Sequence, residues 1–376
     1  MENRPIKVLH FIASLEVGGA ERMLLTLIKN SQNKDIEHVI CTIYNRGSLV
    51  NEAKAAGIKI QSLNLPCKYL YPVAYPLFLF KVLSLKPDII NSFLLQENLI
   101  ARIVGKLILR KKVICGKRDT DTGKSKIKVW FDKITLGLAD LHISNSLAGA
   151  NELISYGVPK EKVLHIPNGK NWSELESKLT KEEAKQKLGL NQDDFVIGYV
   201  ARLYEFKGQK YAIRAMPNIL KKNKTAKLIL VGSGVMLNEL QQLVKDLHVE
   251  NSIVFLGERK DIPDILKSFD IFVFPSLREG LPGALMEAMA AGLPVIATNI
   301  DGNEELIEDE KHGLLIQPQN VLQLSAAIDY LIRSPKIREG IGKAARQKML
   351  KEYSVEKMVK RFEETYIRKR AESTTF

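Results

Sequence analysis

The residues best suited to chemistry lie between positions 276 and 292, where two glutamates flank a turn rich in glycine and proline. Glu279 and Glu287 have seven residues between them, and Pro282 stands in the interval. Proline is tolerated in the first turn of a helix, so the pattern predicts a loop carrying Glu279 and then a helix carrying Glu287. A carboxylate in such a loop can accept hydrogen bonds from sugar hydroxyls, and a second one can hold the two hydroxyls of a ribose. Glu287 alone is also compatible with a simple helix-dipole role.

Two cations form a second candidate group. Arg202 ends an apolar run and Lys207 follows five residues later, just before a predicted helix over 209–220. Cations beside a helix start can hold a diphosphate and neutralise the charge that develops on a leaving group. Two ordinary surface cations would give the same local pattern.

A glycine pair near the N-terminus, Gly18-Gly19, precedes a helical pattern over 20–30. Glycines before a helix let the backbone approach a ligand and present free N–H groups to an anion. The segment lacks a full GxGxxG pattern, so a structural tight turn explains it equally well.

The elements that position these residues alternate between short apolar strands and helical stretches, which is typical of a parallel sheet with crossover helices. In the first half we predict strands at 7–13, 38–44, 58–63, 87–92, 112–116, 141–144 and 163–167. We interpret the polar stretch over 171–194 as the connection between the two domains. A second series follows, at 195–202, 227–232, 252–257, 271–275, 294–298 and 313–316, and the tail over 355–370 is an amphipathic helix with Met358, Phe362 and Tyr366 on its apolar face.

These motifs together resemble the family-4 retaining glycosyltransferases, whose E-x7-E motif corresponds to Glu279 and Glu287. The resemblance covers nearly the whole chain, because further motifs fall in the family's order: Gly18-Gly19-Ala20-Glu21, Asn168-Gly169, Arg202 with Lys207-Gly208, Phe255-Leu256-Gly257, and Asp301-Gly302 with Glu305-Leu306. It implies the α/β GT-B architecture, two facing Rossmann-like domains with parallel sheets. The domains would be an acceptor-binding one (1–172), a nucleotide-sugar-binding one (173–354), and a C-terminal helix (355–376) that packs back on the first.

The resemblance also implies roles for single residues. Arg202 and Lys207 would hold the donor diphosphate, and Glu279 would hold the transferred sugar together with the backbone of Gly280, Leu281 and Pro282. Glu287 would hold the ribose, while the loop from Gly257 through Arg259 to Lys260 would meet the base. Gly18 and Gly19 would approach the phosphates. No metal and no other cofactor is required, because the two cations replace Mg²⁺. The expected mechanism is front-face attack by an acceptor hydroxyl.

The sequence departs from the family pattern on the acceptor side. Many relatives carry a histidine after the strand at 112–116, where this chain has Lys117, Arg118 and Asp119. Arg118 or Asp119 would have to fill that space. The family's common acid at position 171 is replaced by Asn171. Asp119-Thr120-Asp121 also matches the DxD metal motif of another transferase architecture, which in this context we interpret as a chance match.

The bulk properties fit a globular protein with an unevenly distributed charge. The formal net charge is +13, and residues 101–133 alone hold eleven basic and three acidic side chains, interleaved with Val129, Trp130 and Phe131. This basic region predicts an anionic partner surface, for which an acidic membrane leaflet and nucleic acid both qualify, while a merely solvated face is the plain alternative. Three scattered cysteines, no apolar run of about 18 residues and no signal-like start predict a cytoplasmic protein, peripheral at the inner membrane face.

We therefore expect an enzyme that moves a sugar from a nucleotide diphosphate, with UDP favoured, to a lipid-linked or polysaccharide acceptor in cell-surface glycan synthesis. A nucleotide-sugar enzyme without transfer activity, such as an epimerase, is the alternative within the same architecture. A nucleic-acid-binding protein is the alternative from another class. No RNP-like strand, zinc finger or helix-turn-helix signature supports it, so we expect no nucleic-acid partner.

Overall fold

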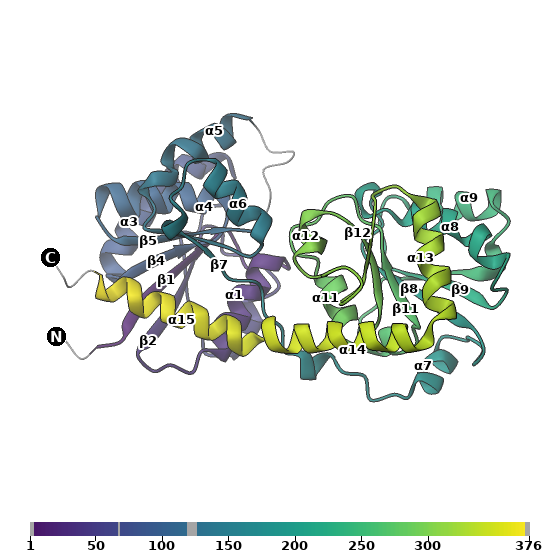
Figure 1. Cartoon of the computed structure of the whole chain (residues 1–376). Coiled ribbons are helices and arrows are strands. Elements are labelled where there is room, and N and C mark those ends of the chain that lie inside the picture. Colours follow the sequence, from purple (N-terminus) through teal and green to yellow (C-terminus); the bar gives the residue numbers. More distant parts are fainter. Residues whose placement is uncertain (1–3, 67, 119–125, 373–376) are drawn as a thin grey trace. The chain divides into compact units, whose positions relative to one another are not determined.

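The computed structural model describes residues 4–66, 68–118 and 126–372, which form two compact units. Unit 1 comprises residues up to Lys170 together with the segment from Val355 onward, and unit 2 runs from Asn171 to Ser354. Each unit has its own parallel sheet (Figure 1). Each also has its own hydrophobic core. Among the described residues, none of the helices is both long enough and apolar enough to cross a membrane.

Unit 1 is built on a seven-stranded sheet of order β3-β2-β1-β4-β5-β6-β7, in which all neighbours pair in parallel. Its strands are β1 (Ile6–Ile12), β2 (Ile36–Thr42), β3 (Lys59–Ser62), β4 (Ile89–Ser92), β5 (Lys112–Lys117), β6 (Leu141–Ser144) and β7 (Val163–His165). Its helices are α1 (Gly19–Asn30), α2 (Val50–Ala55), α3 (Ala74–Leu85), α4 (Leu95–Ile100), the π-helix η2 (Ala101–Ile108), α5 (Lys126–Thr135), α6 (Leu147–Ser155) and α15 (Val355–Ala371). The predicted strands are confirmed to within two residues at each end.

Unit 2 repeats the arrangement with a six-stranded parallel sheet of order β10-β9-β8-β11-β12-β13. Its strands are β8 (Phe195–Val200), β9 (Ala226–Val231), β10 (Ile253–Gly257), β11 (Ile271–Phe274), β12 (Val295–Thr298) and β13 (Leu314–Ile316). Its helices are α7 (Lys181–Lys187), α8 (Gln209–Leu220), α9 (Leu237–Asp246), α10 (Ile262–Lys267), α11 (Gly283–Ala290), α12 (Asp301–Glu304), α13 (Val321–Arg333) and α14 (Pro335–Glu352). The two Rossmann-like sheets confirm the predicted fold class.

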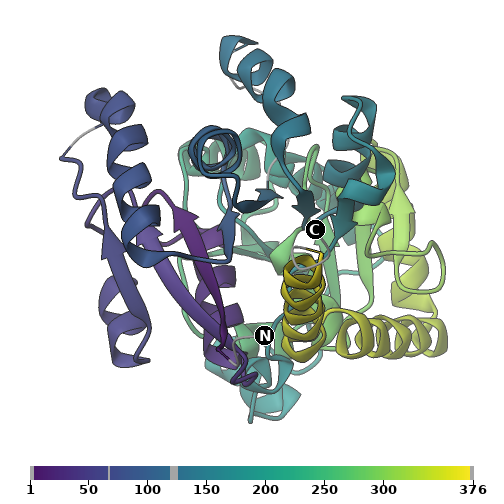
Figure 2. The same cartoon turned by 90° about the vertical axis from the view of Figure 1, so that its left-hand side faces the viewer.

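The C-terminal helix α15 belongs to unit 1. Met358, Phe362 and Tyr366 are all at most 2% exposed and join the core beneath β1 and β4. The Tyr366 hydroxyl accepts a hydrogen bond of 2.7 Å from the Asn91 amide at the centre of the sheet. Figure 2 views this helix, in yellow, nearly end-on beside the strands of unit 1.

The polar stretch over 171–194 differs from its prediction as a plain connection. It contains α7, which begins with a complete capping box between Thr180 and Glu183, and it lies within unit 2. Trp172 is 6% exposed and its indole N–H donates to the Met349 carbonyl at 3.1 Å, so the start of the stretch is packed against α14. Because the segment is highly polar, its sequence did not indicate the helix α7 or the packing of Trp172.

Candidate functional site

The carboxyl ends of β8, β11 and β12 bring three loops of unit 2 together, with glycines at the closest approaches. Gly208 has φ +75°, and a Cβ atom there would lie 1.9 Å from the Pro275 carbonyl oxygen. A Cβ atom at Gly302 would lie 2.5 Å from the Gly280 carbonyl oxygen. Only glycine allows backbones to pass this closely. Ligands of open α/β sheets bind at this strand edge, so the three loops define the candidate site.

At the centre of this edge lies an ion pair that joins two of the predicted residues. Lys207 Nζ lies 2.6 Å from Glu279 Oε1, and the two side chains are 17% and 10% exposed. The same oxygen accepts a 2.6 Å hydrogen bond from the Ser276 hydroxyl. Glu279 Oε2 has no hydrogen-bond donor among the described residues. The carboxylate is therefore fixed through one oxygen, while the other can accept a bond from a ligand hydroxyl.

Ser276 is a residue of this site that the sequence analysis missed. It is fully buried, and its backbone carbonyl accepts from the Thr298 hydroxyl. Asn303, also fully buried, donates in turn to the Thr298 carbonyl at 2.9 Å. A serine three positions before a loop acid, directly after a buried strand, is the sequence signal that could have found it.

Arg202 lies in the neighbouring loop and is solvent-exposed. Its guanidinium carbon stands 5.3 Å from the centre of the Tyr204 ring, and the structure gives it no ion-pair partner within the described part of the chain. The Gln209 amide donates to the Arg202 carbonyl at 2.8 Å and fixes the loop backbone. Of the two predicted cations, Lys207 is thus bound to the acid and Arg202 is available to an anion.

The turn from Gly280 to Pro282 leads into α11, but with a small correction. We predicted Pro282 within the first helical turn, whereas α11 begins at Gly283 and Pro282 is the extended residue before it. The backbone at Pro282 has ψ 108°, and the Met286 N–H still bonds to the Pro282 carbonyl at 3.1 Å. Leu281 packs against the core of the unit. Gly280 and Leu281 therefore keep the loop placement that the sequence predicts.

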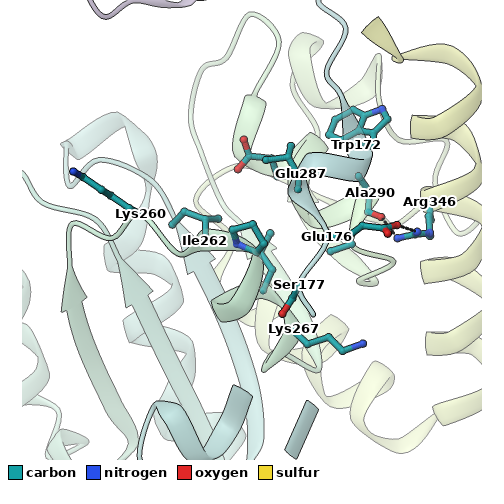
Figure 3. Close-up of a pocket in the computed structure, with 13 residues that line it drawn as sticks. Trp172, Glu176, Ser177, Lys260, Ile262, Lys267, Glu287, Ala290 and Arg346 are labelled. Atoms are coloured by element: carbon teal, nitrogen blue, oxygen red, sulfur yellow. Dashed lines mark hydrogen bonds and ion pairs between the residues drawn. The ribbon is translucent and has the colours of Figure 1, made fainter. Parts of the chain in front are cut away.

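Glu287 faces a different space from Glu279. It lines a cavity of about 490 Å³ in unit 2, together with Lys260, Ile262 and Trp172 among others. Figure 3 shows the Glu287 carboxylate turned away from the Glu176–Arg346 ion pair at the other end of the cavity. Neither Glu279 nor Lys207 lines this cavity. Glu287 thus lies at this cavity, whereas Glu279 lies beside Lys207 at the edge of the unit 2 sheet.

The loop predicted to meet the base begins at Gly257, which has φ +66°. Arg259 uses its Nε and Nη2 atoms to bind both oxygens of Asp261, at 2.8 and 2.7 Å. This pairing holds the pKa of Asp261 well below its usual range, with Lys187 as a further donor. Because its guanidinium is occupied, the Arg259 side chain stiffens the loop, and Lys260 is the side chain of this loop that reaches the cavity.

In unit 1 the glycine pair opens α1, with Gly18 as the extended residue before the helix. A Cβ atom at Gly18 would lie 2.2 Å from the Glu21 Oε2 atom, so the carboxylate of the helix's own first turn covers this glycine. Burial raises the pKa of Glu21. Gly19 has open space around it. Of the two predicted glycines, Gly19 is therefore the one whose backbone a ligand can approach without meeting another side chain.

The predicted acceptor residues are only partly described. Arg118 directly follows β5 and donates from Nη1 to the Asn168 side-chain oxygen at 3.2 Å. Asp119 and the Asp119-Thr120-Asp121 motif lie outside the described residues.

Two cations of the basic region 101–133 are buried and paired inside unit 1, so not all of its charge lies on the surface. Lys117 is 8% exposed and paired with Glu152 at 3.0 Å, and Arg102 is fully buried against Asp132. Among the described residues, the region also carries a row of large exposed apolar side chains on α5: Ile127, Trp130, Phe131 and Ile134, each 48–68% exposed. Leu107 and Ile108, at the end of η2, are exposed as well.

Comparisons with known proteins agree on one family. The family described as Glycosyltransferase Family 4 matches residues 17–171, and the one described as Glycosyl transferases group 1 matches residues 180–348. The chain is 31% identical over 306 residues to an Escherichia coli UDP-Gal:α-D-GlcNAc-diphosphoundecaprenol α-1,3-galactosyltransferase, covering 77% of this chain and 78% of the relative.

Solved structures give the same result. The HepE protein of Anabaena, crystallised with UDP, is similar at a TM-score of 0.84 and 25% identity, over 96% of this chain and 99% of that chain. Its complex with UDP and glucose is similar at a TM-score of 0.79, with the same identity and coverage. The chain with its two Rossmann-like sheets is therefore a GT-B glycosyltransferase, and it belongs to glycosyltransferase family 4.

Proposed function

We propose that this enzyme transfers a hexose or N-acetylhexosamine from a UDP-sugar, with retention of anomeric configuration, to a lipid-linked diphosphate acceptor in cell-surface glycan synthesis. The observation that carries the proposal is the Glu279 carboxylate held by Lys207 and Ser276 at the edge of the unit 2 sheet, with the solvent-exposed Arg202 in the next loop. The UDP and glucose in the HepE complexes support the donor class. The lipid diphosphate in the name of the E. coli relative supports the acceptor class.

The chemistry follows from the charges in this site. A sugar bound at Glu279 can donate a hydroxyl to the unused Oε2 atom, which orients the ring. Arg202 and Lys207 can then neutralise the diphosphate as it leaves, which is the task that a metal performs in other transferases. We therefore propose transfer without a metal, by attack of the acceptor hydroxyl on the face from which the phosphate departs.

We propose that the nucleoside binds in the cavity beside α11. Glu287 can accept hydrogen bonds from the two ribose hydroxyls, and Ile262, just after the end of the base-binding loop, supplies an apolar wall. This assignment separates the two glutamates by function, with Glu279 on the sugar and Glu287 on the ribose.

The test is transfer of labelled sugar to a polyprenyl-diphosphate-linked acceptor, with a panel of UDP-sugars. Glu279→Gln and Lys207→Ala each remove a charge-assisted hydrogen bond, so each is expected to lower kcat/KM by roughly 10- to 100-fold or more. Lys210→Ala is the matched control, because Lys210 lies three residues further on and pairs with the exposed Glu205 at 3.2 Å. Equal activity in all three variants would refute the site. Conversion of the UDP-sugar without an acceptor would favour an epimerase instead.

A lipid-linked acceptor requires access to the membrane surface, and we propose that α5 supplies it at the cytoplasmic face. Its exposed apolar row has the i, i+3, i+4, i+7 spacing of one helix face, while Asp132 on the opposite face is anchored to Arg102. The exposed Lys133 and Arg110 add attraction to anionic lipids, at about 1 kcal/mol each.

Vesicle sedimentation tests this surface. Ile127→Ser with Ile134→Ser is expected to release the protein from vesicles containing anionic lipid, and wild-type Trp130 fluorescence should shift to the blue on binding. Leu322→Ser on α13 is the control, because Leu322 is 72% exposed but lies in unit 2. Undiminished binding of the double variant would eliminate α5 as the membrane contact.

A further inference from the structure

Arg118 is a half-buried cation, and two of its nitrogens have no hydrogen-bond acceptor among the described residues. It stands at the carboxyl end of β5, and its guanidinium carbon lies 5.5 Å from the Phe93 ring centre and 5.8 Å from that of Phe362. Nη1 donates to Asn168, but Nε and Nη2 are shielded from solvent and have no acceptor among the described residues. No carboxylate of the described chain forms an ion pair with it.

Arg102, a buried arginine of the same unit, shows what a structural arginine looks like in this fold. Its Nε donates to the Asn98 carbonyl at 3.1 Å, and Nη1 donates to the Asp132 carbonyl and the Thr135 hydroxyl, each at 3.0 Å. Its Nη2 is bound to the Asp132 carboxylate. Every nitrogen of Arg102 therefore has a partner inside the protein, as a buried charge normally requires.

The two Arg118 atoms without an acceptor, Nε and Nη2, lie on the same edge of the guanidinium and can donate two parallel hydrogen bonds; we call this edge the fork. Arg259 places the same two atoms, Nε and Nη2, on the two oxygens of Asp261. Such a fork fits two oxygens of a carboxylate or a phosphate. In Arg118 this fork is intact and unoccupied by any described protein group.

The Arg118 guanidinium lies between two aromatic rings, so its charge is poorly solvated and an anionic partner would stabilise it. Desolvation lowers the pKa of Arg118 to about 10, so the side chain still carries its charge at neutral pH. The neighbouring Lys117 is paired with Glu152 at 3.0 Å, whereas no carboxylate of the described residues pairs with Arg118. A cation of this kind is stabilised when a ligand supplies the negative charge.

We propose that the Arg118 fork binds a phosphate group of the acceptor diphosphate. The proposal rests on the lipid-diphosphate acceptor proposed above. Arg202 and Lys207 of unit 2 already provide cations for the donor diphosphate, whereas Arg118 belongs to unit 1 and has Asn168 beside it as a further polar contact. Arg118 thereby takes the place of the missing histidine with a different task, which is to select an acceptor that carries phosphate.

The kinetic test compares two acceptors with the same terminal sugar, one linked to a lipid diphosphate and one an alkyl glycoside without phosphate. Arg118→Gln is expected to raise KM for the diphosphate acceptor at least tenfold, with KM for the UDP-sugar and for the alkyl glycoside unchanged. Arg118→Lys keeps the charge but loses the fork, so it should lie between. Arg368→Gln, at an exposed arginine of the same unit that has no part in either proposed binding surface, is the control for general charge. An equal loss with both acceptors, or a rise confined to the donor KM, overturns the proposal.

A binding measurement keeps this inference separate from the activity. Calorimetry with inorganic pyrophosphate on the UDP-saturated protein reports anion sites outside the donor site. Wild type and Arg368→Gln are expected to bind, and Arg118→Gln is expected to bind at least tenfold more weakly. Equal pyrophosphate affinity in wild type and Arg118→Gln contradicts the phosphate site, even if the acceptor of the enzyme proves to be another molecule.

Discussion

Replacement of Ser276 by alanine probes how the Glu279 carboxylate, proposed to bind the donor sugar, is held. The Ser276 hydroxyl donates 2.6 Å to Glu279 Oε1, the oxygen that also receives Lys207. A hydrogen bond to a charged group contributes about 1.5–3 kcal/mol. Because Lys207 still holds the same oxygen in the variant, we expect the lower part of that range, about 1.5–2 kcal/mol. If that energy is needed to place Glu279 in the transition state, kcat/KM for the UDP-sugar falls roughly 10- to 30-fold.

The matched control is Ser268→Ala in the same unit. Ser268 is fully buried like Ser276, and its hydroxyl donates to the Ile265 carbonyl at 2.7 Å, away from the site. Both variants should lose about 1 kcal/mol of stability, but only Ser276→Ala should lose transfer. Binding of UDP, which lacks the sugar, should be unchanged in both. Transfer by Ser276→Ala at the level of Ser268→Ala would refute the claim that Ser276 positions Glu279.

Two further predictions concern the scaffold. Gly208 and Gly189 both have a positive φ, +75° and +69°, but only at Gly208 would an added Cβ atom collide with backbone. Gly208→Ala should therefore abolish transfer. It should also lower the melting temperature, measured by calorimetry, much more than Gly189→Ala does. Comparable melting temperatures would contradict the tight contact with Pro275. Burial lowers the pKa of His142 to about 4, whereas the imidazole of an unfolded chain has a pKa of about 6.5. Unfolding below pH 6.5 therefore takes up a proton. The contribution of His142 to the free energy of unfolding falls by about 2 kcal/mol between pH 7 and pH 5. Hydrogen exchange of β6 should show this loss in wild type and less of it in His142→Gln; an identical pH dependence would contradict it.

Much of the fold was predictable because the strands of a parallel sheet are buried on both faces and read as apolar runs. The segment 271–274, with Phe272 and Phe274, is fully buried and was found directly. The helix after Gly208 and the C-terminal helix were found from their periodicity. The helix over 181–187 was missed, because its capping box lies in a polar segment that offers no apolar stripe.

The site was predictable as a list of residues but not as a set of contacts. Glu279 and Lys207 were assigned to different parts of the donor, yet they bind each other, a pairing that depends on the adjacency of β8 and β11 in the sheet. Charge counting also failed to separate exposed from buried cations, so Lys117 was placed on a surface that it does not reach. Burial of a charge is decided by tertiary packing, which spacing along one chain does not encode.

The anomeric configuration of the product tests the central claim most directly. The purified enzyme would be incubated with an α-linked UDP-sugar and the lipid-diphosphate acceptor, and the new linkage would be read from the anomeric proton in an NMR spectrum. With the donor sugar held by Glu279 and the diphosphate by Arg202 and Lys207, we predict an α-linked product that fails to form with Glu279→Gln. A β-linked product, or the same α-linked product at wild-type rate from Glu279→Gln, would contradict it.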